Sequence, residues 1–422
     1  MTSSTASPSG VAGISDTNIV RELAARYAEL CADPDQHRRR EDWRRHNSLE
    51  RVPGILIFVR AFAWSEMPES RLQCEDPLLR NIERQLRMGI FRSGFRDDFV
   101  LEPWVTVDAC LELPGKGIWG PPLRWTENRS RGGAGVIDPP VKRLEDIDKI
   151  VPAHHRVDEV ETARRFEKSC EAIGDLVVVN LDRGPAYRSW AADISTHLAQ
   201  LRGLEQLMWD MYDNPEWLHR VLARMRDGIL RNQEEAERAG DWRLCNHDNQ
   251  AVSYCRELPD PAANSAPVSR SQLWFRAASQ ELTLVGPEQF EEFMLRYQQP
   301  IMANFGLVAW GCCEEMTSRI PLLKRVPNMR RIAVTPVSDA AKCAELIGDG
   351  YVASYRPSPA DMVSYRFDEG RIRGILKRDL EAFRANGCFV DITLKDVETV
   401  EGDTERVTKW VALVRRIVEE LS

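Results

Sequence analysis

Apolar stretches of strand length alternate with amphipathic stretches of helix length along most of the chain. The stretches at 55–59, 176–181 and 307–310 are apolar at nearly every position. Strands that are apolar on both faces are typical of parallel sheets covered by helices. This pattern predicts eight strands, near Ile55, Val105, Val178, Leu244, Val308, Ala333, Val352 and Ile392.

Eight strands that mostly alternate with helices predict an α/β fold, a TIM (β/α)8 barrel, more than an open doubly wound sheet. No GxGxxG or P-loop sequence follows a predicted strand, which weighs against a dinucleotide-binding fold. We expect a disordered tail at 1–15, a helical extension at 16–50 and a single barrel domain at 51–422. The Gly/Pro-rich segment 113–140 predicts an inserted loop, which could serve as a lid or as a dimer contact.

The composition narrows the class of protein. The 422 residues carry a formal net charge of -8 and are 43% hydrophobic, which is ordinary for a soluble globular protein. No basic face for nucleic acid or for an anionic membrane is implied, and no apolar run of about 18 residues predicts a membrane helix. Ten scattered cysteines without a CxxC motif indicate a reduced, cytoplasmic protein.

Several polar residues follow directly after predicted strands. The active site of such a barrel lies at the carboxyl ends of its strands, so these side chains are expected to meet at one mouth. They are Asp182, Arg183, His247, Asp248, Cys312, Cys313, Glu314, Arg356, Lys395 and Asp396, with Trp64 and Glu66 after the first strand. Helix capping, structural ion pairs and simple packing are the alternatives for each residue alone.

The stretch 307–314, LVAWGCCE, ends on two adjacent thiols and a carboxylate. Adjacent cysteines rarely form a disulfide, because the linkage strains the peptide between them. Metal ligation, nucleophilic chemistry and packing remain open for the pair. A thiolate, an imidazole and carboxylates together could bind zinc, which would act as a Lewis acid on the atom that bears a transferred group.

The segment 285–293, VGPEQFEEF, resembles a helix start of the uroporphyrinogen decarboxylase superfamily, and 392–421 resembles its closing unit. The resemblance covers the C-terminal half well and the N-terminal half in outline. Zinc-dependent corrinoid methyltransferases of this superfamily carry His-x-Cys-Gly after the same strand. Here Cys313 matches the cysteine, Gly311 stands at the histidine position, and Asp396 stands near the place of a last cysteine ligand.

The resemblance implies a metal-dependent methyltransferase that acts on a small methylated substrate and exchanges the methyl group with a corrinoid carried on a separate protein. Zinc would be held by Cys313, His247, Asp396 or Glu281. Cys313, Asp248 and Glu314 are the expected catalytic residues, and Asp182, Arg183, Arg356, Lys395 and Trp64 are the expected substrate-binding residues, with the two arginines on an anionic group.

Three alternatives stay open. The first is a metal-free decarboxylase or lyase, in which Asp182 or Asp248 would stabilise a protonated intermediate. Porphyrinogen itself is not expected as the substrate, because the arginine-rich N-terminal motif of true uroporphyrinogen decarboxylases was not found. The second is a non-catalytic barrel that binds a small ligand or serves as a partner subunit. The third concerns assembly, since a homodimer is compatible with the sequence.

Overall fold

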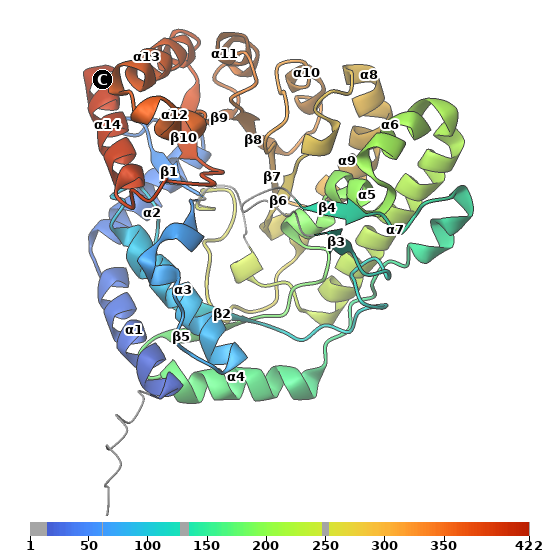
Figure 1. The fold of residues 1–422 in the computed structure, drawn as a ribbon, viewed down its shortest axis with the longest axis horizontal. Helices are drawn as coiled ribbons and strands as arrows, with labels where there is room; N and C mark the ends of the chain where they lie inside the picture. The colour runs from blue at the N-terminus through green and yellow to red at the C-terminus, as the bar shows by residue number, and fades with distance from the viewer. Residues whose placement is uncertain (1–14, 61, 127–134, 247–252, 422) are drawn as a thin grey trace, which may run out of the picture.

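The computed structural model describes residues 15–60, 62–126, 135–246 and 253–421, and its parallel strands surround the centre of the molecule with helices outside them (Figure 1). The strands are β1 (Ile57–Val59), β2 (Trp104–Asp108), β3 (Arg124–Thr126), β4 (Val136–Asp138), β5 (Val178–Asp182), β6 (Trp274–Ala277), β7 (Leu307–Trp310), β8 (Met329–Val334), β9 (Val352–Tyr355) and β10 (Phe389–Leu394). The α-helices are α1 (Asp16–Cys31), α2 (Asp35–Asn47), α3 (Pro77–Ser93), α4 (Glu159–Ile173), α5 (Ile194–Arg202), α6 (Leu204–Asp213), α7 (Pro215–Ala239), α8 (Pro287–Phe290), α9 (Arg296–Met302), α10 (Ile320–Leu323), α11 (Ala340–Ile347), α12 (Ala360–Val363), α13 (Glu369–Ala385) and α14 (Arg406–Leu421).

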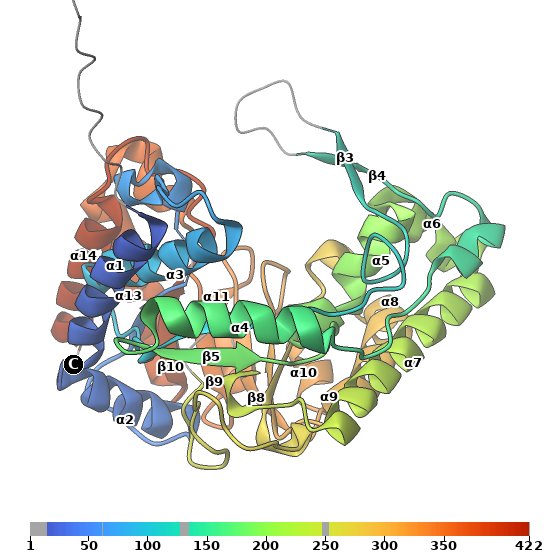
Figure 2. The ribbon, with the colours of Figure 1, turned by 90° about the horizontal axis from the view of Figure 1, so that it is seen from below.

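Six strands form one parallel sheet in the order β1-β10-β9-β8-β7-β6, and β2 and β5 form a separate parallel pair. Figures 1 and 2 show that the six-stranded sheet curls, with β2 and β5 between its two ends. The last strand in sequence, β10, pairs with the first, β1, as in a barrel. The fold is therefore TIM-like, but the closed barrel expected from the sequence is not formed.

The ring is interrupted beside β1, where two carboxylates take the place of a neighbouring strand. The backbone amide of Ile57 donates to Asp98 Oδ2 at 2.8 Å, and that of Val59 donates to Asp97 Oδ2 at 2.7 Å. Both aspartates are 2% exposed. Because these amides are already satisfied, β2 has no backbone donors to pair with on this edge of β1.

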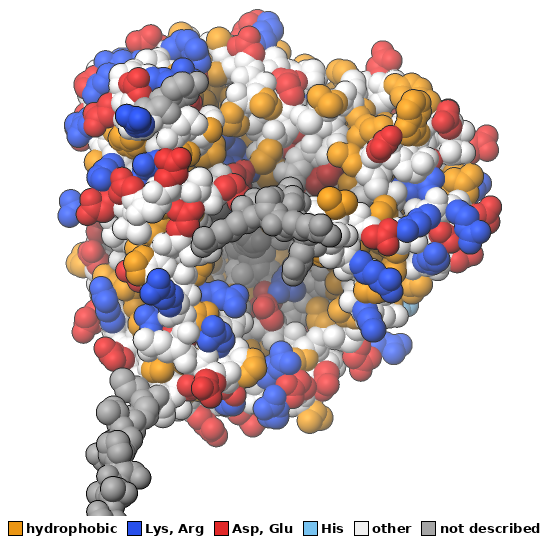
Figure 3. Space-filling view, viewed as in Figure 1, with side chains coloured by type: hydrophobic (Ala, Val, Ile, Leu, Met, Phe, Trp, Pro, Cys, Tyr) orange, Lys and Arg blue, Asp and Glu red, His pale blue; other side chains and the backbone are white. Residues whose placement is uncertain are grey.

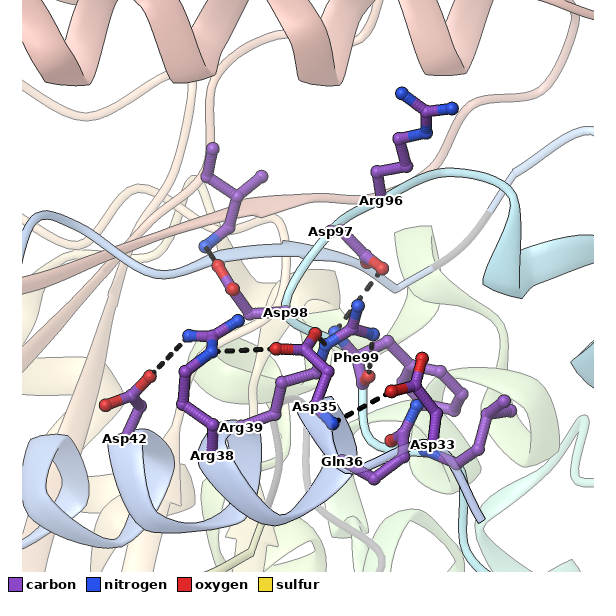
Figure 4. Close-up of polar contacts among 12 residues, drawn as sticks. Asp33, Asp35, Gln36, Arg38, Arg39, Asp42, Arg96, Asp97, Asp98 and Phe99 are labelled. Carbon is purple, nitrogen blue, oxygen red and sulfur yellow. Dashed lines mark hydrogen bonds and ion pairs between the residues drawn. The ribbon is translucent and has the colours of Figure 1, made fainter. Parts of the chain in front are cut away.

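Helix α2 holds the segment that carries these aspartates. Trp43 Nε1 donates to the Asp98 carbonyl at 2.7 Å, and Arg39 donates to the Phe99 carbonyl at 2.8 Å. Figure 4 shows α2 lying along this segment, with Arg39 paired to Asp35 of the same helix. Helix α2 thus helps to hold the segment whose aspartates end the sheet beside β1.

The second interruption lies beside β5 and explains a wrong prediction. The strand expected near Leu244 is a single 3-10 turn, Leu244–Asn246. The edge of β5 is taken instead by the side chain of Asn264, which accepts from the Leu181 amide at 3.0 Å and donates to the Val179 carbonyl at 2.8 Å. A segment near Leu244 therefore cannot pair with this edge of β5.

The strand that the sequence analysis missed is β6, whose four residues are all buried. Its only charged residue, Arg276, is 1% exposed and lies over the Trp190 ring at 5.1 Å. A charged residue within four positions hides a strand from a search for continuous apolar runs. β6 is the edge strand of the six-stranded sheet and pairs with β7.

The segment 113–140 contains an antiparallel pair of short strands, β3 and β4. In Figure 2 this pair projects from the body of the molecule. No helix among the described residues is long and apolar enough to cross a bilayer. The predicted tail at 1–15 lies outside the described residues except for Ser15, which caps α1.

Replacing Asp98 with alanine should lower the free energy of unfolding by about 2–3 kcal/mol, because the buried Ile57 amide loses its charged acceptor. The same change removes the partner of Arg415, whose guanidinium lies 2.9 Å from Asp98. Urea unfolding measures the loss. Asp349→Ala, at an exposed aspartate, is the matched control and should change stability little; equal stability of both variants would contradict this account of the β1 edge.

Candidate functional site

The thiol pair sits on a turn that glycine alone permits. β7 ends at Trp310, and Gly311 follows with a φ of +111°. A Cβ on Gly311 would lie 2.6 Å from the Cβ of Ala333. A histidine, as in the His-x-Cys-Gly motif of the methyltransferases that the sequence resembles, therefore has no room at this position, and the turn presents Cys312 and Cys313.

Glu314 holds this turn through hydrogen bonds to backbone amides. Its side chain is fully buried, and its Oε2 accepts from the Cys312 amide at 2.8 Å while Oε1 accepts from the Ser279 amide at 2.9 Å. One carboxylate thus ties the segment after β6 to the segment after β7. Glu314 contacts these two backbone amides and neither thiol. Its geometry is therefore that of a positioning residue.

Lys395, the first residue after β10, reaches across the ring to both sulfurs. Its Nζ lies 3.0 Å from Cys312 Sγ and 3.1 Å from Cys313 Sγ. The same ammonium pairs with Asp396 at 2.7 Å, and Asp396 Oδ2 lies 3.2 Å from Cys313 Sγ. Two thiols, one ammonium and one carboxylate therefore form a compact cluster at the carboxyl ends of β7 and β10.

This cluster makes Cys312 the more acidic thiol. A hydrogen bond from the Cys313 thiol, whose sulfur lies 3.7 Å away, is the largest cause that lowers the pKa of Cys312. Burial opposes it, but the positive charges of Lys395 and Arg356 add to it, and the pKa falls to about 6. The pKa of Cys313 is raised, because its proton is held by Cys312 and because it is half-buried. At neutral pH the pair thus holds one thiolate, on Cys312, and one thiol.

Two arginines complete the positive side of the cluster. Arg356, the first residue after β9, is 3% exposed and donates to the carbonyls of Gly311 and Cys312 at 2.8 and 2.7 Å. Burial lowers the pKa of Arg356 to about 10, and its Nε is buried without a hydrogen-bond partner. Arg60, the first residue after β1, lies near enough to influence the pKa of both Arg356 and Asp396 by its charge.

Neither arginine has a carboxylate partner among the residues described. No ion pair joins Arg60 to a described acid, and its guanidinium lies over the ring of Trp190 at 5.8 Å. Since β9, β10 and β1 are neighbours in the sheet, Arg356, Lys395 and Arg60 form a row of cations along one rim.

The other predicted residues lie in different surroundings. Arg183 pairs with Asp241 at 2.6 Å and with Glu159 at 2.7 Å. These are structural ion pairs, the alternative to substrate binding for this residue. Asp182 accepts from the Gly184 amide and lies 3.3 Å from Arg188.

Two further predicted residues, Trp64 and Glu281, form no hydrogen bond to either sulfur in the part of the chain that the structure describes. Trp64 packs edge-on against the ring of Phe62, at 6.0 Å between centroids. Glu281 accepts from the hydroxyls of Ser195 and Thr196 at 2.9 and 2.8 Å. His247 and Asp248 lie outside the described residues.

The donors that the structure describes do not fit a zinc ion. Within that part of the chain no group of three or more His, Cys, Asp and Glu side chains is arranged to hold a metal. Cys313 and Asp396 are in contact, but the ammonium of Lys395 lies between the sulfurs, where a cation would have to bind. Zinc therefore stays a prediction that depends on His247.

The sequence analysis missed Arg60 and Ser279. Arg60 carries the same signal as the predicted residues, since it is the first polar residue after an apolar strand, but Trp64 and Glu66 further along were chosen instead. Ser279 could not be found, because its strand, β6, was not predicted. Arg60 is the more consequential omission, since it leaves the cation row incomplete.

No protein-family model and no curated protein sequence matches the chain. Among solved structures, a methyltransferase from Methanosarcina mazei is similar at a TM-score of 0.47 and 13% sequence identity, covering 91% of this chain and 99% of that one. The chain is therefore assigned to no family.

Alkylation of Cys312 by iodoacetamide should reach half of its maximal rate near pH 6, because the thiolate forms above the pKa of about 6. Lys395→Met should move this midpoint upward by about one unit or more, since an opposite charge is lost. Lys395→Arg, which keeps the charge, is the control. Peptide mass spectrometry separates Cys312 from Cys313, and a wild-type midpoint near the ordinary thiol value of 9.0 would contradict the described cluster.

Proposed function

We propose that the chain is an enzyme that transfers a methyl group, or a similarly small alkyl group, between a small anionic substrate and an acceptor, with Cys312 as the nucleophile. The observation that carries this proposal is the position of Lys395 Nζ at 3.0 and 3.1 Å from the two sulfurs. An ammonium between two thiols favours one thiolate, and the thiolate is the reactive form of cysteine.

The neighbours of Cys312 have separate roles in this proposal. Glu314 and Arg356 hold the backbone of the thiol turn through its amide and its carbonyls, so the sulfur is presented in one orientation. Cys313 supplies a thiol proton next to the nucleophile, and Asp396 Oδ2 lies 3.2 Å from its sulfur. Lys395 stabilises the thiolate by charge.

The substrate class follows from the cation row. Arg60 and Arg356 have no described carboxylate partner, so an anionic group of a substrate would supply the missing charge. A carboxylate or sulfonate fits two guanidinium groups by charge and by hydrogen bonding. In this proposal Arg60 takes the place that the sequence analysis gave to Arg183, while Arg356 keeps its predicted role.

The proposed reaction is a displacement at carbon. The Cys312 thiolate attacks the methyl carbon, a sulfur–carbon bond forms, and the bond from that carbon to the substrate heteroatom breaks. The heteroatom keeps the electron pair and takes a proton from Cys313 or Lys395. In the second half, a nucleophile presented by another protein takes the methyl group from the sulfur, Cys312 returns to its thiolate form, and the group that gave up its proton regains one from solvent.

Two finer parts of this proposal come from the sequence resemblance alone. A corrinoid protein is the acceptor that it implies, and zinc is the metal that it implies. The decarboxylase alternative needs Asp182 or Asp248 as its acid, and Asp182 is already engaged by Gly184 and Arg188. No described contact favours that alternative, so a single function is proposed.

The anionic subsite can be tested without knowing the substrate. Iodoacetate carries a carboxylate and iodoacetamide does not, so their ratio of alkylation rates at Cys312 reports the local charge. Arg60→Gln should lower that ratio by about tenfold while leaving the iodoacetamide rate nearly unchanged. Arg84→Gln, at an exposed arginine of α3, is the control; a ratio that is equal in all three proteins would contradict the subsite.

The transfer itself is tested with small carboxylates and sulfonates that carry S-, N- or O-methyl groups labelled with deuterium. In a single turnover without acceptor, Cys312 should gain one labelled methyl group, seen by peptide mass spectrometry. Cys312→Ser should abolish the gain, and Lys395→Met should slow it by about 100-fold. Cys110→Ser is the control, and labelling of several cysteines alike would contradict the assignment.

Elemental analysis of the same preparation addresses the metal. About one zinc per chain, lost in both Cys313→Ala and His247→Ala, would support the zinc-dependent version. If zinc-free protein still gains a methyl group on Cys312, the thiolate mechanism operates without a metal.

A further inference from the structure

Large hydrophobic side chains gather in the open around α6. Trp209 is 58% exposed and Tyr212 is 73% exposed, and both lie on this helix with Leu204 at 48%. Trp125 and Val136 of the β3–β4 pair are 59% and 67% exposed. Figure 3 shows the hydrophobic side chains over α6, at the upper right. We call the set Trp125, Val136, Leu204, Trp209 and Tyr212 the α6 surface.

The helix has two distinct faces. Leu207 and Met211 are buried, four positions apart, and point into the core. Trp209 and Tyr212 lie on the outer side, where a helix normally carries polar residues, and Leu204 is the exposed first residue of the helix. Isolated exposed hydrophobic residues are common, but a contiguous group with a tryptophan and a tyrosine is typical of a protein interface.

A groove runs along this surface between the β3–β4 pair and α5. Its volume is about 410 Å³, and its lining includes Trp125, Val136, Leu204 and the carboxylate of Glu281. No lysine or arginine is among the described residues that line it. Glu281 accepts hydrogen bonds from Ser195, Thr196 and Gln280, but no described base forms an ion pair with it.

Among the described residues, the charged side chains of α6 and of the groove lining are all acidic. Helix α6 contains no lysine or arginine, and its exposed acids, Glu205 and Asp213, form no ion pair with a described residue. With Glu281 they give three unpaired carboxylates beside an apolar, aromatic surface. The charge that would complement this surface is positive.

We propose that the α6 surface is the docking site of a protein partner that presents an apolar segment carrying lysine or arginine side chains. Apolar residues of the partner cover Trp209, Tyr212 and Trp125, and its basic residues reach Glu205, Asp213 and Glu281. A second copy of the chain fits less well, because a two-fold interface through α6 would set Glu205 and Asp213 of each copy against the same acids of the other.

The docking site is joined to the thiol cluster by a short path. Glu281 lies two residues after Ser279, whose amide donates to Glu314, and Glu314 also accepts from the Cys312 amide. A partner seated on the groove is thus held against the segment that positions the nucleophile. The inference does not rest on the proposed reaction, since it follows from exposure and charge alone.

The test uses a defined probe, a fluorescent helical peptide of about four turns built from leucine and lysine, with a leucine and glutamate peptide as its charge control. Fluorescence anisotropy of the full-length protein at physiological salt measures both affinities. The lysine peptide should bind, and the double substitution Trp209→Ala, Tyr212→Ala should weaken it by about tenfold or more. The double substitution Glu205→Gln, Asp213→Asn should weaken it several-fold.

Val160→Ala is the matched control, because Val160 is 82% exposed on α4, away from this surface. It should leave binding unchanged, and the substituted residues are all exposed, so thermal unfolding should report an intact fold in each variant. Equal binding by every variant, or equal binding of the glutamate peptide, would overturn the proposal. Sedimentation of the wild type adds a further outcome: a dimer abolished by the Trp209, Tyr212 substitution would assign the surface to a second copy instead.

Discussion

The contact of Lys395 with the two thiols depends on the curl of the sheet more than on any local sequence. β7 and β10 are separated by β8 and β9, so in a flat sheet their ends would lie about 14 Å apart, three spacings of about 4.8 Å. A lysine side chain cannot span that distance. The curl brings the ends of the two strands together across the ring, and residues 82 and 83 positions apart then touch.

The same curl decides which charges accumulate. Each of β9, β10 and β1 is followed at once by a cation, and neighbouring strands place Arg356, Lys395 and Arg60 on one rim. Such a row is unfavourable by itself, because like charges repel and Arg356 is buried. It persists because carbonyl groups, a thiolate and Asp396 lie within reach, and because the apolar core beneath holds the strands in register.

Much of this arrangement was predictable from the sequence. Apolar runs in the sequence predict seven of the eight ring strands, and the rule that polar residues after parallel strands converge predicts that Cys312, Cys313, Lys395 and Asp396 meet. The prediction of strands failed where the apolar pattern did not match the structure. Arg276 masked β6, and a stretch near Leu244 that looks extended in sequence forms a turn.

The remaining features were not predictable because they are set by tertiary contacts. Position 311 has no room for a histidine because Ala333 of the next strand lies against it. The pairing of Arg183 likewise depends on Asp241, which lies beyond α7. The loss of closure depends on three side chains, Asp97, Asp98 and Asn264, that satisfy strand edges from a distance. A sequence pattern records which residues are apolar, but it does not record which carboxylate will reach which amide.

These substitutes for strand pairing have a consequence for how the wall of the ring can change during evolution. A backbone ladder survives almost any substitution, since its hydrogen bonds belong to the main chain. The wall beside β1 and β5 is held instead by three replaceable side chains, so one codon change can loosen it while the six-stranded sheet and the β2–β5 pair keep their backbone hydrogen bonds. Variation in the width of the enclosed space is therefore easiest to acquire beside β1 and β5.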